Sequence, residues 1–155
     1  MRLQRKRVPG GSRARCRGLT LVEILIALVV LSIGLLGLAG LQTLSLRFNT
    51  SAFHRTQATA LAYDFADRMR ANRQAALNNE YALAFEDPVP ACGVPNLAGT
   101  VAQQDIASWR NALTCRLPEG TGSVTRNGSE FTFSVRWDDS QGQDAPMTFQ
   151  FTTAL

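Results

Sequence analysis

An uncharged apolar run close to the amino terminus is the strongest constraint on this chain of 155 residues. Residues 24–41 read ILIALVVLSIGLLGLAGL, which is 18 residues without a charged side chain. A helix of about 20 apolar residues spans a bilayer, so this run is long enough to cross a membrane. Residues 1–17, a segment rich in lysine and arginine, precede this run, and the positive-inside rule places such a segment in the cytoplasm. We therefore expect the residues after Leu41 to lie outside the cytoplasm.

The distribution of charge changes the meaning of the basic composition. The chain carries 16 basic and 12 acidic residues, a net charge of +4. Seven of the basic residues lie in the first 18 positions. From Leu19 onward the chain therefore contains nine arginines and twelve acidic residues. Because the body of the chain is mildly acidic, the overall charge is no argument for nucleic-acid binding, and we expect no nucleic-acid partner.

The boundary between the basic and apolar segments, residues 17–23, has the sequence RGLTLVE. Gly18 is small and flexible, which allows the chain to enter a protease cleft in an extended form. Glu23 places a carboxylate at the edge of a membrane helix, where ionisable groups are costly and usually functional. The simpler interpretation of Glu23 is that its side chain reaches the lipid headgroups.

This junction resembles that of type IV prepilins, which have a basic leader ending in glycine, a hydrophobic first residue and a glutamate at the fifth position after the cut. The resemblance implies that a prepilin peptidase cleaves between Gly18 and Leu19 and methylates the new amine. Leu19 stands where the family usually has phenylalanine or methionine. The amine of Leu19 in a neighbouring subunit is then the expected partner of Glu23, and this pairing sets the axial register of the filament.

A secretory signal peptide is the alternative interpretation of the amino-terminal segment. Residues 37–39 (GLA) are small enough for signal peptidase, and cleavage there would release a soluble protein that begins at Gly40. Against this alternative, the apolar core is longer than the roughly 7–15 residues typical of signal peptides, and Glu23 lies beside it.

Helical character continues beyond the apolar run. Residues 42–76 contain no proline or glycine, and three apolar residues recur at the spacing of one helix face: Leu61, Phe65 and Met69. We predict one continuous helix over about residues 20–76, apolar all round in its first half and amphipathic in its second. Three glycines inside the apolar run are open to two interpretations, a close-packing face or a stretch that unwinds in a filament: Gly34, Gly37 and Gly40.

The last third of the chain is predicted to form an antiparallel sheet. Asn127-Gly128 is a strong hairpin signal between two strand-like segments, residues 123–126 and 130–137. Alternating apolar residues predict a further strand over 147–152. Before the sheet, a proline-containing loop leads to a short helix over 106–113, with Asp105 as its candidate N-cap.

These elements predict an α+β, pilin-like fold, in which a long amino-terminal transmembrane helix packs its carboxyl-terminal half on a small antiparallel β-sheet. The expected organisation is a removed leader (1–18), a transmembrane or filament-core half of the helix (19–41), an amphipathic half (42–77) and a loop with a β-sheet domain outside the cytoplasm (78–155).

Three cysteines are present, and Cys16 lies in the leader. Cys92 and Cys115 remain in a segment that we place in the periplasm, where disulfides form and persist, so we predict a bridge between them. Such a bridge would contribute about 3 kcal/mol by the chain-entropy estimate. Two buried free thiols are the alternative.

Candidate catalytic and metal-binding residues are sparse, so we expect no enzyme, no cofactor, no bound metal and no small-molecule substrate. His54 is the single histidine, and we expect it on an exposed polar helix face. Without a second histidine or a further cysteine, neither a zinc site nor a Cys-His nucleophile can be assembled. Residues 138–144 are rich in oxygen ligands for Ca²⁺ but lack the EF-hand spacing, and a solvated turn explains them equally well.

Two segments of the carboxyl-terminal domain, residues 117–124 (LPEGTGSV) and 135–139 (VRWDD), resemble the PilV branch of minor pilins. This resemblance implies a low-abundance subunit that primes pilus assembly at or near the tip. Its partners would be prepilin peptidase, other minor and major pilins and the inner membrane. The chain would begin as a single-pass inner-membrane precursor with a cytoplasmic amino terminus and end in the pilus at the cell surface.

Two other functions are compatible with the same features. A type II secretion pseudopilin would have an identical leader and helix. A tip module that binds a surface or DNA is the third hypothesis, and DNA binding requires several phosphate contacts from basic residues. Four arginines would then have to cluster: Arg110, Arg116, Arg126 and Arg136.

Overall fold

The computed structural model describes residues 18–86 and 88–155. The expected leader, apart from Gly18, lies outside the described residues, and so does Cys16. The elements are, in chain order, α1 (Leu21–Ala71), α2 (Arg73–Leu77), α3 (Val101–Arg116), β1 (Thr121–Asn127), β2 (Glu130–Trp137) and β3 (Met147–Ala154). The chain divides into two units, Met1–Leu44 and Ser45–Leu155, and each is described by itself.

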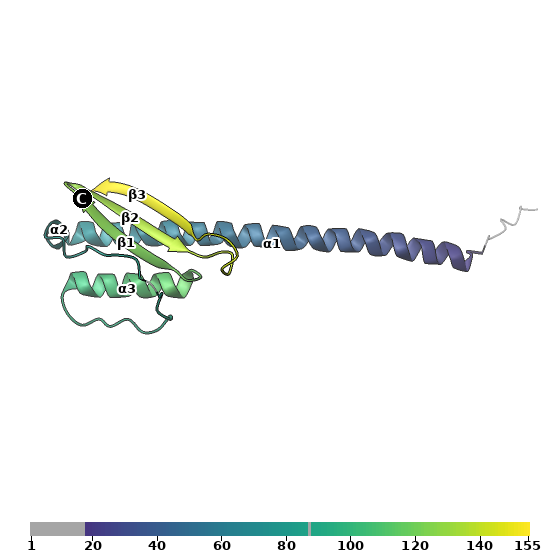
Figure 1. Ribbon diagram of the computed structural model, residues 1–155, viewed down its shortest axis with the longest axis horizontal. Coiled ribbons are helices and arrows are strands. Elements are labelled where there is room, and N and C mark those ends of the chain that lie inside the picture. Colours follow the sequence, from purple (N-terminus) through teal and green to yellow (C-terminus); the bar gives the residue numbers. More distant parts are fainter. Residues whose placement is uncertain (1–17, 87) are drawn as a thin grey trace, which may run out of the picture. The chain divides into compact units, whose positions relative to one another are not determined.

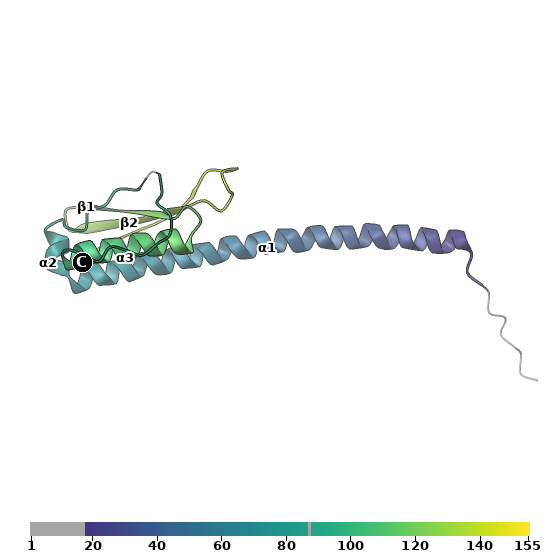
Figure 2. The ribbon, with the colours of Figure 1, turned by 90° about the horizontal axis from the view of Figure 1, so that it is seen from below.

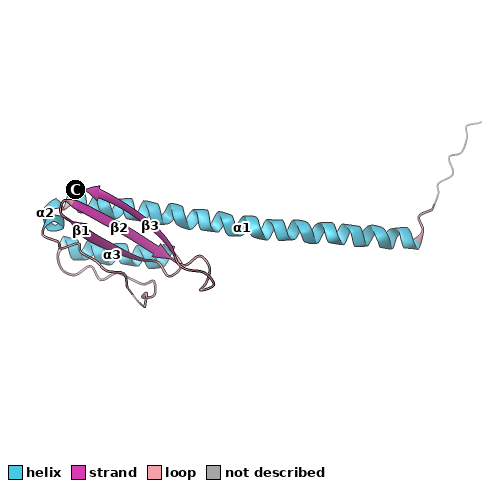
Figure 3. Ribbon diagram, turned by 45° about the horizontal axis from the view of Figure 1, so that its top comes forward, coloured by secondary structure: helices cyan, strands magenta, loops and turns pink. Residues whose placement is uncertain are grey.

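The fold class predicted from the sequence is confirmed. In the Ser45–Leu155 unit, the carboxyl-terminal part of α1 packs on a three-stranded antiparallel sheet in the order β1-β2-β3. Figure 3 shows the three strands side by side, and Figure 2 shows the sheet on one side of α1 and α3. The unit is therefore a two-layer α+β structure with its core between the sheet and the two helices (Figure 1).

The core is built from the apolar faces that the sequence pattern predicts. The inward residues of β2 are at most 2% exposed, and they face the α1 stripe, whose residues are at most 5% exposed. Phe65 stacks on Trp109 of α3 with ring centroids 4.2 Å apart and meets Phe133 edge-on at 6.4 Å. The indole N–H of Trp109 donates to the carbonyl of Leu61 at 2.9 Å, which attaches α3 to α1. Aromatic pairs of this kind contribute about 0.5–1.5 kcal/mol beyond their buried area.

Within the described residues, the prediction of one helix through residue 76 was wrong at its end. α1 stops at Ala71, and Asn72 has φ −116° and ψ 48°, which is outside the helical region. The Asn72 amide donates to the hydroxyl of Tyr81 at 3.1 Å. Asparagine is a weak helix former because its side chain finds partners in non-helical conformations, and here a tertiary contact supplies one.

The helix predicted over 106–113 is longer than expected and has a different N-cap. α3 begins at Val101, and Thr100 forms a capping box with Gln103, in which each side chain accepts from the backbone N–H of the other residue. Asp105 lies inside the helix and accepts a hydrogen bond from the Tyr81 hydroxyl at 2.7 Å. Burial, followed by this hydrogen bond, raises the pKa of Tyr81 to about 12.

The predicted hairpin is present. Asn127 pairs with Glu130, so Gly128 and Ser129 form a two-residue turn between β1 and β2. Gly128 has φ +62°, which matches a type II′ turn with glycine at its first central position. On the outer edge of β1, Leu83 and Val124 exchange two backbone hydrogen bonds, of 3.0 and 2.8 Å.

Candidate functional site

The residues around the expected cleavage point lie at the start of α1. Gly18 and Leu19 are exposed and precede the helix, which begins at Leu21. The hydroxyl of Thr20 accepts from the backbone N–H of Glu23 at 3.2 Å, and the Thr20 carbonyl accepts from Ile24 at 3.3 Å. Thr20 therefore caps the helix, and the bond expected to be cut lies outside regular structure.

The role of Thr20 was missed at the sequence level, although the pattern Thr20-x-x-Glu23 is a known N-cap signature that could have revealed it. Glu23 stands in the first turn, where a carboxylate interacts favourably with the positive end of the helix dipole. Within residues 18–86 and 88–155, no side chain donates a hydrogen bond to the Glu23 carboxylate or pairs with it. Its charge is thus available for a contact outside the described chain.

The apolar side chains that follow Glu23 are uncovered in the Met1–Leu44 unit. From Leu21 to Leu44 the large apolar residues are about half exposed or more. By length and composition, α1 is the helix of the described chain that is able to cross a membrane. Ser32 and Thr43 donate their hydroxyls to carbonyls four residues earlier, at 2.7 and 3.0 Å, so these polar groups find their partners within the helix itself.

The three glycines of this unit have free space around them. A Cβ atom added at Gly34, Gly37 or Gly40 would meet no heavy atom within 4 Å. No contact among the described residues therefore requires glycine at these positions. The two hypotheses for them, close packing of another helix and local unwinding, remain predictions.

The structure contains a disulfide between Cys92 and Cys115, whose Cα atoms are 4.8 Å apart. The bridge joins the loop that precedes α3 to the last turn of that helix. Asn111 accepts from the backbone N–H of Gly93 at 3.1 Å and so fixes the same loop a second time. The loop carries exposed apolar residues, and the disulfide limits its freedom.

The prediction of an exposed His54 was wrong. Its side chain is 15% exposed, and its Nδ1–H donates to the carboxylate of Asp139, 2.5 Å away. Ser51 and the indole of Trp137 donate to the same carboxylate at 2.8 and 2.9 Å. Partial burial opposes the charged form of Asp139, but the hydrogen bonds from His54, Ser51 and Trp137 outweigh it and lower the pKa. This cluster fastens the loop after β2 to α1.

Residues 138–144 form a turn that satisfies its own carboxylate. Asp138 accepts from the hydroxyl and the backbone N–H of Ser140, both at 2.7 Å, and from the N–H of Gly142 at 2.5 Å. The hydrogen bonds from Ser140 come first among the causes that lower the pKa of Asp138. Within the described residues no group of three or more His, Cys, Asp or Glu side chains converges as metal ligands do. The arrangement favours the turn over the calcium site.

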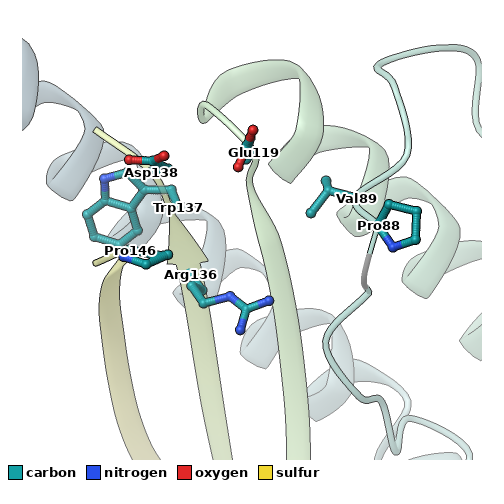
Figure 4. Close-up of a pocket in the computed structure, with 7 residues that line it drawn as sticks. All are labelled: Pro88, Val89, Glu119, Arg136, Trp137, Asp138 and Pro146. Atoms are coloured by element: carbon teal, nitrogen blue, oxygen red, sulfur yellow. The ribbon is translucent and has the colours of Figure 1, made fainter. Parts of the chain in front are cut away.

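A pocket of about 330 Å³ lies in the Ser45–Leu155 unit at the end of β2 (Figure 4). Its lining consists of Pro88, Val89, Glu119, Arg136, Trp137, Asp138 and Pro146. The guanidinium of Arg136 lies over the ring of Phe85, 4.6 Å from its centroid. These seven lining residues include no serine, cysteine, lysine or histidine, so the pocket itself supplies no nucleophile with an adjacent base.

Three of the four arginines considered for DNA binding have defined contacts within the domain. Arg126 lies near the hairpin and donates to the carbonyls of Leu77 and Gly128, whereas Arg136 pairs with Thr121 at the opposite end of the ladder. Arg110 Nε is 3.1 Å from a Glu86 oxygen, close enough for an ion pair although not aligned as a hydrogen bond. Arg110, Arg126 and Arg136 are thus each in contact with other groups of the domain, and a DNA site formed by all four arginines stays a prediction.

Comparison with known proteins gives one finding. Residues 13–39 match the family described as the prokaryotic N-terminal methylation motif. No curated protein and no solved structure matches the chain. The motif covers the expected cleavage point and most of the apolar run, so it supports a type IV pilin-like protein that is processed by prepilin peptidase and assembles with other pilins. Together with the exposed apolar helix, it fits a membrane-anchored precursor.

Proposed function

We propose that this chain is a minor pilin of a type IV pilus, cut between Gly18 and Leu19 and incorporated at or near the tip to prime assembly. The observation that carries the proposal is the methylation motif at residues 13–39, placed at the start of an apolar helix. The small sheet domain of Ser45–Leu155 supports it, because a domain of this kind offers side-specific contacts to neighbouring subunits. The resemblance of residues 117–124 and 135–139 to the PilV branch supports the minor-pilin assignment.

In this proposal the protein is a structural subunit and a peptidase substrate rather than an enzyme. Residues 1–18 are removed, and residues 19–41 hold the precursor in the inner membrane. Residues 42–77 form the amphipathic half of the helix, and residues 78–155 form the domain that lies outside the cytoplasm. The helix keeps its apolar surface covered when it leaves lipid, because it enters a bundle of similar helices.

In this proposal Glu23 sets the axial register of the subunit in the filament. A carboxylate in an apolar bundle is costly unless it is paired, and the methylated amine of Leu19 in a neighbouring subunit is the proposed partner. The absence of a partner for Glu23 within the described residues is compatible with a contact between subunits. Because Thr20 caps the helix through the backbone of Glu23, the carboxylate is not needed for this cap.

Mass spectrometry of the amino terminus tests the proposal. We expect N-methyl-Leu19 as the first residue of the mature chain. Gly18→Leu should leave the full precursor in the membrane, because a bulky branched side chain does not fit the peptidase cleft. A mature chain that begins at Gly40 would instead identify a secretory signal peptide and overturn the proposal.

A further inference from the structure

The two edges of the sheet differ. The outer edge of β1 is paired with Leu83, whereas no strand of the described chain pairs with the outer edge of β3. β3 is eight residues long, and its sequence, MTFQFTTA, contains no charge and no proline. Natural proteins usually protect a free edge with charges, proline, a bulge or a very short strand, because unpaired N–H and C=O groups attract other strands. The sequence of β3 carries no charge or proline to do so.

The apolar layer under the sheet is also unfinished on this side. The inward residues of β2 are at most 2% exposed, whereas those of β3, among them Phe149 and Phe151, are only partly buried. Tyr63 on α1 stacks on Phe151 with centroids 4.5 Å apart and is still 48% exposed. An additional strand beside β3 would bring inward side chains over these aromatic rings and complete the layer.

The paired edge of β3 indicates what kind of strand fits. β2 runs antiparallel to β3, and its sequence, EFTFSVRW, alternates apolar inward residues with polar outward ones. Arg70 donates to Thr153 at the carboxyl-terminal end of β3 and is itself paired with Asp67, so this end of the edge carries no unbalanced positive charge. An antiparallel partner would therefore alternate apolar inward residues with polar outward residues, as β2 does.

We propose that the outer edge of β3 pairs with an extended strand of another subunit of the same filament. This strand is antiparallel to β3 and has apolar residues at alternate positions. Backbone hydrogen bonds supply the affinity, and the side chains over Phe149, Phe151 and Tyr63 supply the specificity. The inference rests on the proposed function, because it names the surface with which this subunit recognises a filament partner.

Site-specific crosslinking in cells that assemble the filament tests this pairing. A photoreactive benzoylphenylalanine replaces Gln150 on the exposed face of β3, and the same group replaces Thr125 on the exposed face of β1 as a control. We expect an adduct from position 150 whose captured peptide comes from a strand-forming segment of a different pilin-like subunit. Equal adducts from both positions, an adduct with a second copy of this chain or one with lipid alone would overturn the proposal.

A pair of variants at one position tests the mechanism. In Phe149→Lys the new ammonium group can reach water while the edge is free, but an added strand would bury it. Phe149→Ala loses the same aromatic packing and introduces no charge. We expect the Lys variant to lower the Gln150 adduct about tenfold or more relative to the Ala variant, at similar melting temperatures. Equal adducts in the two variants would contradict the pairing.

The outcome also separates this inference from the proposed function. A protein that begins at Leu19 and is found in sheared filaments, but gives no adduct from position 150, is a pilin without β3 pairing. A protein that does not begin at Leu19 and is missing from filaments contradicts both proposals.

Discussion

Gly122 in β1 allows a close approach between the sheet and α3, and its replacement is the most direct test of the packing. A Cβ atom at this position would lie 2.3 and 2.7 Å from two ring carbons of Trp109 and 2.8 Å from a methyl carbon of Leu113. Real Cβ atoms essentially never come this close, and both partners are buried, so the indole or the strand must move. Overpacking of a core costs about 1–3 kcal/mol. For a domain of this size, Gly122→Ala should lower the melting temperature by about 4–12 °C.

A matched glycine controls for the intrinsic effect of the substitution. A Cβ atom at Gly93 would meet nothing within 4 Å, and Gly93 does not have a positive φ. Gly93→Ala should therefore change stability by less than about 1 kcal/mol, with a small gain expected from the stiffer unfolded chain.

A double-mutant cycle identifies the clash itself. Trp109→Phe removes the two ring carbons that the new Cβ would meet, although it also removes the hydrogen bond to Leu61. The hydrogen-bond loss is common to both arms of the cycle and cancels, so Gly122→Ala should cost clearly less in the Trp109→Phe background.

Thermal unfolding of the full chain in detergent, followed by near-ultraviolet circular dichroism, measures the native protein, the Gly93→Ala control and the three variants of the cycle. The reasoning is refuted if Gly122→Ala is as stable as Gly93→Ala, or if its cost is unchanged when Trp109 is Phe.

Three further predictions follow from the sites. Glu23→Ala should leave cleavage and membrane insertion near normal but sharply reduce crosslinking to partner pilins, because a broken buried pair costs about 3–5 kcal/mol; undiminished crosslinking contradicts the register mechanism. Alkylation of the mature protein without reduction should label neither Cys92 nor Cys115, and labelling of both would show that the bridge is absent in the cell. The lowered pKa of Asp139 means that its stabilisation is complete above about pH 4 and is lost as the pH falls through the folded value. The gap between the melting temperatures of the native protein and Asp139→Asn should therefore stay constant from about pH 6 to pH 4 and close as the pH falls below about 4, and a gap that does not close would exclude this role.

Much of the fold could be predicted because its signals are local. The apolar helix is recognised from consecutive side chains in residues 24–41. The Asn127-Gly128 hairpin and the alternation of apolar and polar residues in β2 are recognised from a few residues each. The start of α3 was also readable, since Thr100 and Gln103 form a capping-box pattern, but the prediction followed the apolar face from Ile106 instead. That error concerns a helix boundary and leaves the packed face unchanged.

The amino-terminal site is local for the same reason. The predicted processing residues, Gly18, Leu19 and Glu23, form a linear pattern, so predicting them requires no tertiary contact. The geometry adds Thr20, whose hydroxyl caps α1 through the N–H of Glu23. It also places Gly18 and Leu19 before the helix.

Other features were decided by the tertiary structure, because the partners are far apart in the chain. Asp139 receives hydrogen bonds from Ser51 and His54, which are 88 and 85 residues away, and no local pattern predicts which polar side chains a folded core will bring together. The end of α1 depends on Tyr81, whose hydroxyl accepts from Asn72. The sequence alone therefore determined a helix long and apolar enough to cross a membrane and a small antiparallel sheet, and its cleavage point stays a prediction. Burial and long-range hydrogen bonding determined where that helix ends, how the loop after β2 is fastened to it and which edge of the sheet is left open.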